Sequence, residues 1–154
     1  MLEWYSNKYV SIFFDNIPKV AIRYILPSTP KECKKSIKKY PFINKRVLKV
    51  TLLDKKKNKE YLFEIPKGYC YDGASVPRFF WRVIGANTDN KFLIAALIHD
   101  VLCENHNYVE NDRYFSTIVF ERLLYTSKIN PFSRWVMKHS VDNFQKLKGW
   151  KNEL

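Results

Sequence analysis

The stretch RVLKVTLLDKKKNKEYLFEIP, Arg46 to Pro66, predicts a β-hairpin. Both arms are rich in β-branched and aromatic residues, and polar and apolar residues alternate from Lys49 to Leu53. The segment DKKKNK, Asp54 to Lys59, supplies a polar loop between the arms. We therefore expect two antiparallel strands with one face toward solvent.

Two shorter segments before this hairpin also have the composition of strands. YVSIFF (Tyr9 to Phe14) and VAIRYIL (Val20 to Leu26) are rich in β-branched and aromatic residues and are separated by turn-forming residues. Between them and the hairpin, KECKKSIKK (Lys31 to Lys39) could form a short basic helix. The strand-rich part of the chain is therefore expected to span residues 1–70.

After residue 75 the apolar residues recur at three and four positions, which is typical of helices. Three segments share this spacing and open with Asn, a preferred N-cap residue: Asn90 to Asn105, Asn111 to Ser127 and Asn130 to Leu147. Strands followed by helices predict an α+β fold in one domain, residues 1–154. In this fold a small antiparallel sheet from the N-terminal half packs with three or four C-terminal helices, which span residues 75–150.

The chain is strongly basic, with 27 Lys and Arg against 15 Asp and Glu and a net charge of +12. Most of the excess lies before residue 65, where lysines are concentrated in the segments Lys31 to Lys39, Lys45 to Lys49 and Asp54 to Lys59. Such a surface is either a solvated face or a site that attracts an anionic substrate, an acidic protein partner or nucleic acid without sequence preference.

The sequence predicts neither a membrane span nor a signal peptide. It has no run of eighteen or more apolar residues, and its N-terminus lacks a basic segment followed by an apolar one. The three cysteines, Cys33, Cys70 and Cys103, form no C-x-x-C pair, which favours a reducing compartment over a disulfide framework.

The stretch YDGASVPRFFW, Tyr71 to Trp81, lies between the two halves of the chain. Asp72 and the following glycine are typical of a turn, Ser75 of a helix cap, and Pro77 could begin a short helix. The same residues could instead form the rim of a reactive pocket. Local sequence alone leaves both interpretations open.

His99 and Asp100 occur together in the apolar segment LIAALIHDVLCEN. On a helix both lie on stripes with apolar residues, so both side chains are expected to face inward. A buried carboxylate is costly unless it is paired or binds a metal. Asp112 could be the partner, although it could equally be an ordinary N-cap of the next helix.

If Asp72, His99, Asp100 and Asp112 converge, they form an oxygen-rich site suited to Mg, Mn or Zn, and such a site would activate water. Two weaker alternatives involve Cys103, which could join His99 and His106 in a zinc site or form a Cys-His dyad. A small buried filler is the interpretation of Cys103 that we favour.

Three motifs in order, IPKGYCYDGASVPRFFW, AALIHDVLCEN and NDRYF, resemble domain of unknown function 1353, a family found in bacteriophages and prophages. The resemblance spans about Ile65 to Phe120. It implies that the polar positions shared with the family form one site, and these are Asp72, Ser75, His99, Asp100 and Asp112. It implies no reaction.

We therefore predict a phage or prophage protein that performs metal-assisted hydrolysis of an anionic substrate, either a phosphoester or cell-wall material. Asp72, His99 and Asp112 would bind the metal, Asp100 would bind it or act as general base, and Ser75 would orient substrate or cap a helix. The alternative is a non-catalytic interaction protein, such as a virion or tail component or an inhibitor of a host defence component, in which this cluster is structural. Either protein would be found in the cytoplasm of the bacterial host or in the virion.

Overall fold

The computed structural model describes residues 1–73, 90–127 and 129–150. The described strands all lie in the N-terminal half and all but one of the described helices lie in the C-terminal half, so the predicted α+β class is confirmed. The strands form two antiparallel sheets. Ser75 and the short helix that was expected to begin at Pro77 lie outside the described residues.

The larger sheet has four strands in the order β1-β2-β5-β6. Their bounds are Leu2–Ser6 for β1, Val10–Phe14 for β2, Leu48–Asp54 for β5 and Lys59–Ile65 for β6. Strands β5 and β6 are the arms of the predicted hairpin, and they pair from Leu48 opposite Ile65 to Asp54 opposite Lys59. The apolar residues of β5 at Leu48, Val50 and Leu52 are buried in the core.

The turn of this hairpin is organised by the first residue of the predicted polar loop. The Asp54 carboxylate accepts hydrogen bonds from the backbone N–H groups of Lys56 (3.1 Å) and Lys57 (3.2 Å). Asn58 completes the turn with a φ of 49°, a left-handed conformation that Asn tolerates better than most residues. The lysine-rich loop is therefore ordered by its Asp and Asn residues.

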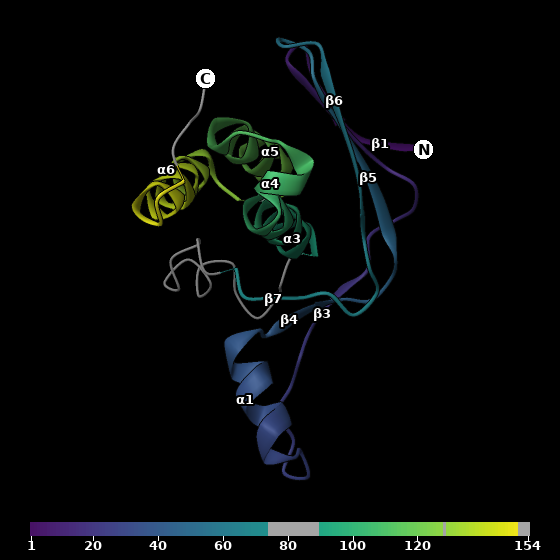
Figure 1. Cartoon of the computed structure of the whole chain (residues 1–154), viewed down its shortest axis with the longest axis vertical. Coiled ribbons are helices and arrows are strands. Elements are labelled where there is room, and N and C mark those ends of the chain that lie inside the picture. Colours follow the sequence, from purple (N-terminus) through teal and green to yellow (C-terminus); the bar gives the residue numbers. More distant parts are fainter. Residues whose placement is uncertain (74–89, 128, 151–154) are drawn as a thin grey trace.

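The smaller sheet has the order β3-β4-β7 and lies between the C-terminal helices and helix α1 (Lys31–Lys39) in Figure 1. Its strands are short: Val20–Ile22 for β3, Phe42–Asn44 for β4 and Cys70–Tyr71 for β7. The predicted strand from Val20 to Leu26 therefore ends four residues early. Helix α1, Lys31–Lys39, connects β3 to β4 with the predicted bounds and lies apart from the other helices in Figure 1.

The C-terminal helices lie together on one side of the larger sheet (Figure 1). Their bounds are Asn90–Glu104 for α3, His106–Val109 for α4, Arg113–Tyr125 for α5 and Pro131–Leu147 for α6. Every residue of α3 from Phe92 to Leu102 is buried, so this helix is enclosed on all sides. Asn130 caps α6, as expected, by accepting a hydrogen bond from the Ser133 N–H (2.8 Å).

Two contacts fasten the α3 helix and the hairpin to their neighbours. The Tyr71 hydroxyl at the end of β7 donates a hydrogen bond to the Leu93 carbonyl of α3 (2.8 Å). Lys59, at the hairpin tip, donates to the Glu110 carbonyl between α4 and α5 (2.9 Å).

Among the described helices, none has the length and apolar character needed to cross a membrane.

Candidate functional site

A cavity of about 920 Å³ brings together segments that are far apart in the sequence. The end of α1, the segment after β7, the last turns of α3, helix α4 and the end of α6 all contribute described residues to its lining. Five of these residues carry carboxyl groups: Asp72, Asp100, Glu104, Glu110 and Asp112. Two lysines, Lys39 and Lys148, and three aromatic residues, Tyr40, Phe144 and Trp150, also line it.

Asp100 lies on α3 at the wall of this cavity, and it is only 6% exposed. Its Oδ2 atom accepts a hydrogen bond from the Gly73 N–H (2.9 Å). Gly73 has a φ of 61°, a left-handed conformation that favours glycine, and this conformation presents its N–H to α3. The corner predicted from the sequence thus contacts the helix that carries the His-Asp pair.

The pKa of Asp100 is raised to about 8, chiefly because burial disfavours the charged carboxylate. The Gly73 N–H and Lys148 act in the opposite direction, whereas the negative charges of Asp72 and Glu104 raise the pKa further. Asp100 is therefore mostly neutral at pH 7 and can both donate and accept a proton near neutral pH.

Asp72 is the second sequence-predicted residue at this cavity. It follows β7 directly, is partly exposed, and lines the cavity with Asp100. The negative charge of Asp72 contributes to the raised pKa of Asp100, after burial. The structure thus brings together Asp72 and Asp100, as the sequence predicted, while Ser75 lies outside the described residues.

His99 faces the protein interior and is only 1% exposed. Its ring lies 5.0 Å from the Phe120 ring, between centroids, and its Nδ1 atom is 4.0 Å from Asp100 Oδ1. Burial lowers the pKa of His99 to about 4, so the ring is neutral at pH 7. His99 is absent from the described lining of the cavity, and its neighbours are those of a core residue.

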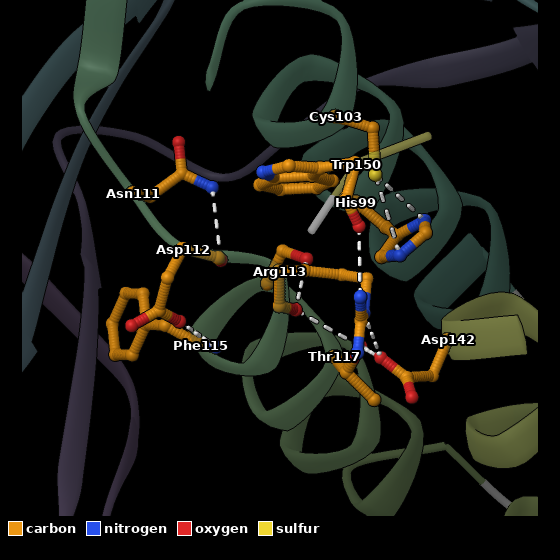
Figure 2. A network of polar contacts seen from close by, with 10 residues as sticks. His99, Cys103, Asn111, Asp112, Arg113, Phe115, Thr117, Asp142 and Trp150 are labelled. Atoms are coloured by element: carbon orange, nitrogen blue, oxygen red, sulfur yellow. Dashed lines mark hydrogen bonds and ion pairs between the residues drawn. The ribbon is translucent and has the colours of Figure 1, made fainter. Parts of the chain in front are cut away.

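Cys103 lies one turn after His99, with its Sγ atom 3.5 Å from Nε2 and 3.7 Å from Nδ1 of that ring (Figure 2). Burial raises the pKa of the Cys103 thiol, so the thiol is protonated at neutral pH and a poor nucleophile. The His106 ring stacks on Trp150 at 4.4 Å between centroids. The protonated thiol argues against a Cys-His dyad, and Cys103 is a partly exposed residue of the cavity lining.

Asp112 is the N-cap of α5, which was the simpler of its two predicted roles (Figure 2). One carboxylate oxygen accepts a hydrogen bond from the Phe115 N–H (2.5 Å). The other forms an ion pair with the Lys57 Nζ atom of the hairpin (2.7 Å). Asp112 lines the cavity, but both of its oxygens already have partners in the protein.

The predicted metal ligands, Asp72, His99 and Asp112, therefore have different surroundings. Within residues 1–73, 90–127 and 129–150, no three His, Cys, Asp or Glu side chains are grouped so that they could hold a metal ion. Asp72 is at the cavity, His99 is in the core, and Asp112 is paired. A metal at this site stays a prediction.

Sequence reasoning missed the residues that close the cavity at the C-terminal end of the chain. Arg113 forms an ion pair with Asp142 of α6 (Nε to Oδ1, 2.9 Å) and donates a hydrogen bond to the Trp150 carbonyl (2.8 Å) (Figure 2). Thr117 donates to the same Asp142 oxygen (3.2 Å). These contacts hold Trp150 at the cavity, and no local motif around it indicates this position.

Tyr69 and Glu104 form a second contact that the motifs did not indicate. The Tyr69 hydroxyl donates a hydrogen bond to Glu104 at the end of α3. Burial and the neighbouring Glu104 carboxylate raise the pKa of the Tyr69 phenol, which keeps it protonated as a donor. The strand side of the cavity is thereby tied to the helix that carries Asp100.

Comparison with known proteins identifies a family and no activity. A family model described as "Protein of unknown function (DUF1353)" matches residues 47–141, which confirms the resemblance drawn from the three motifs. The uncharacterized protein y4jT of Sinorhizobium fredii (strain NBRC 101917 / NGR234) is 38% identical over 50 residues, which cover 32% of this chain and only 15% of that protein. No solved structure matches the chain. The link to bacteriophages stays a prediction.

Proposed function

The chain belongs to the domain of unknown function 1353 family, and we propose that this member is a hydrolase in which Asp100 transfers the proton. One observation carries the proposal: a buried carboxyl with a pKa of about 8 lies at the wall of a large cavity. Strongly shifted carboxyl groups in cavities are typical of catalytic acids and bases.

The second carboxyl, Asp72, gives the reaction its base. In the proposed step a water molecule bonds to the electrophilic atom of the substrate and gives a proton to Asp72. The bond to the leaving oxygen breaks, and neutral Asp100 gives that oxygen its proton. The two groups suit these roles because Asp100 is buried and neutral, whereas Asp72 is partly exposed and its negative charge favours the neutral form of Asp100.

The described lining of the cavity supports a choice between the two predicted substrates. Carboxyl groups outnumber lysines among the described lining residues, which disfavours a phosphate group unless a cation accompanies it. The aromatic residues Tyr40, Phe144 and Trp150 offer apolar faces on which a sugar ring can pack. We therefore favour an uncharged glycan portion of cell-wall material over a phosphoester.

The metal-assisted form of the reaction requires side chains at the site that can hold a metal ion. A divalent ion such as Mg, Mn or Zn would be held by Asp72 and Asp112, and Lys57 would have to leave its ion pair with Asp112. Activity measured before and after treatment with a chelator separates the two forms. If the chelator abolishes activity and one of these metals restores it, the metal-assisted form is supported, and unchanged activity supports proton transfer by Asp72 and Asp100 without a metal.

The central test is hydrolysis of cell-wall fragments and of phosphodiesters by wild-type protein, by Asp100→Asn and by Asp72→Asn. Asn at position 100 keeps an oxygen that can accept from the Gly73 N–H, so the fold should be retained. Glu60→Gln is the matched control, because Glu60 is an exposed carboxylate on β6. We expect activity to fall at least about 100-fold in both Asp variants and to be unchanged in the control. Equal activity in all four proteins would overturn the proposal.

A second candidate, the non-catalytic interaction protein, rests on the contact between Asp100 and the Gly73 N–H. That bond and the buried His99 could serve only to lock α3 to the end of β7. Under this alternative, Asp100→Asn changes stability, and no substrate is hydrolysed by wild-type protein. Mass spectrometry of purified virions would then test whether the protein is a virion or tail component. If the protein is absent from the virions, the remaining form of this alternative is a cytoplasmic phage or prophage factor.

A further inference from the structure

Five lysines lie along one face of helix α1. Lys34 and Lys35 follow Lys31 by three and four residues, and Lys38 and Lys39 follow Lys35 by three and four, which places all five on one face of an α-helix. The residues between them, Cys33, Ser36 and Ile37, lie on the opposite side. We call these five lysines the lysine face.

The lysine face carries positive charge that the rest of the described protein does not neutralise. None of the five lysines forms an ion pair with a carboxylate among the described residues, and Glu32 is the only acidic residue of the helix. The contrast with the hairpin is direct, because Lys57 is paired with Asp112 there.

Helix α1 is also placed so that a long ligand can lie against it. It has no buried residue, and in Figure 1 it lies apart from the other helices, beyond the smaller sheet. Arg23 supports its far side by donating to Ser36 Oγ (3.4 Å) and to the Tyr40 carbonyl (3.1 Å). Lys31, Lys35 and Lys38 are exposed, whereas Lys34 is partly buried and the Lys39 Nζ atom lies 5.3 Å from the centroid of the Tyr40 ring.

The chemistry of this face fits a linear polyanion. At 1.5 Å per residue, the stripe is about 12 Å long, which is enough to meet several consecutive phosphates of one strand. Lysine is a point charge that contacts phosphate, and it lacks the planar fork with which arginine reads guanine. The opposite side has no large apolar stripe of the kind with which helices enter a lipid surface.

We propose that the lysine face binds the phosphate backbone of nucleic acid without reading its sequence. This binding does not rest on the hydrolase activity, because four of the five lysines do not line the cavity that contains Asp100: Lys31, Lys34, Lys35 and Lys38. Lys39 is the one member that also lines the cavity, so it is left unchanged in the test below.

The test compares two triple variants that lose the same charge. The lysine-face variant carries Lys34→Gln, Lys35→Gln and Lys38→Gln. The control variant carries Lys56→Gln, Lys67→Gln and Lys146→Gln, at three separate exposed positions. Binding of a fluorescently labelled DNA duplex is followed by anisotropy between about 50 and 200 mM salt. Circular dichroism and thermal unfolding check that both variants fold.

We expect the plot of log affinity against log salt to be less steep for the lysine-face variant, with the magnitude of its negative slope reduced by about 2 to 3. The reason is that about 0.9 counterion is released for each phosphate contact. Affinity at the lowest salt should fall by about tenfold or more, and the control should bind like wild-type protein. Replacing the same three residues with Arg should restore binding.

Three outcomes would overturn the proposal. Equal losses in the two triple variants would mean that net charge alone attracts the DNA. No binding by wild-type protein at low salt would exclude a nucleic-acid site. Tighter, lysine-dependent binding of polyglutamate or of vesicles with anionic lipid would assign the face to an acidic protein or a membrane surface instead.

Discussion

Helices α1 and α3 differ in how they meet solvent. No residue of α1 is buried, whereas every residue of α3 from Phe92 to Leu102 is. Burial gives α3 its chemistry, because the low-polarity surroundings shift the Asp100 and His99 pKa values in opposite directions. Exposure leaves α1 with four exposed lysines and one partly buried lysine, Lys34. Helix α3 can therefore carry a reactive carboxyl group, and helix α1 can carry positive charges that attract an anionic ligand.

The largest expected difference between the two helices is in stability. Leu97→Ala removes a fully buried side chain of α3 and should lower the free energy of unfolding by about 2 to 5 kcal/mol. Ile37→Ala is the matched truncation on α1, where the side chain is only partly buried, and it should lower that free energy by about 1 kcal/mol or less. Urea unfolding measures both, and equal effects would contradict the contrast.

The pH dependence of stability should sharpen the role of Asp100. Its pKa is about 8 in the folded protein and 3.8 in the reference state, so the folded state holds a proton that the unfolded state releases. Stability from this group is therefore greatest at low pH and is lost as pH rises toward 8. Between pH 6.5 and 8 the free energy of unfolding should fall by about 1.5 kcal/mol.

His99 has the opposite sign in a lower pH range. Its pKa falls from 6.5 to about 4 on folding, so the unfolded state binds the extra proton, and the contribution of His99 to stability rises from pH 4 to 6.5, where it opposes the fall from Asp100. Above pH 6.5 only the Asp100 effect is expected from this pair. Asp100→Asn should therefore flatten the stability profile between pH 6.5 and 8, as measured by urea unfolding at each pH. A decline that persists in this variant would assign it to another group.

A smaller effect is expected at the start of α5. Asp112→Ala removes the N-cap and should lower the free energy of unfolding by about 1 kcal/mol, whereas Asp112→Asn should retain most of it because Asn also caps helices well. The same pair tests the predicted metal role. Loss of hydrolysis in the folded Asn variant would show that the carboxylate of Asp112 acts as more than a cap.

The smallest effect is expected on the lysine face. Lys35→Ala should change the free energy of unfolding by less than about 0.5 kcal/mol, because Lys35 is exposed and forms no ion pair with a described residue. Thermal unfolding provides the measurement. A clear destabilisation would indicate that α1 packs through its lysines, which would weaken the case for a free binding face.

Local patterns predicted the parts of this fold that local forces determine. The hairpin from Arg46 to Pro66 and the helix from Lys31 to Lys39 were recognised because alternation, spacing and turn residues are written in adjacent positions. Strand β7 was missed because it has only two residues, Cys70 and Tyr71, and exists through pairing with β4. Such short strands carry no periodicity of their own.

Local patterns also predicted only part of the candidate site. Spacing predicted that His99 and Asp100 face inward, and the Asp-Gly turn together with the family motif indicated that Asp72 belongs near them. Periodicity cannot say which inward group reaches a cavity, and α3, enclosed on all sides, places Asp100 at the wall and His99 in the core. The contact of Arg113 with Trp150 joins positions that no local pattern relates.

The hairpin turn has a consequence for anyone who modifies this protein. A polar loop rich in lysine is an obvious place to insert a tag or a fluorescent reporter, because exposed loop tips usually tolerate insertions. Here the tip is anchored twice to the helices, through Lys57 to Asp112 and through Lys59 to the Glu110 carbonyl. An insertion between Asp54 and Lys59 would pull on the first turn of α5 and on the cavity lining beside it. The exposed segment 24–28, between β3 and α1, is the better position for a reporter, since no described hydrogen bond or ion pair joins it to α3, α4, α5 or α6.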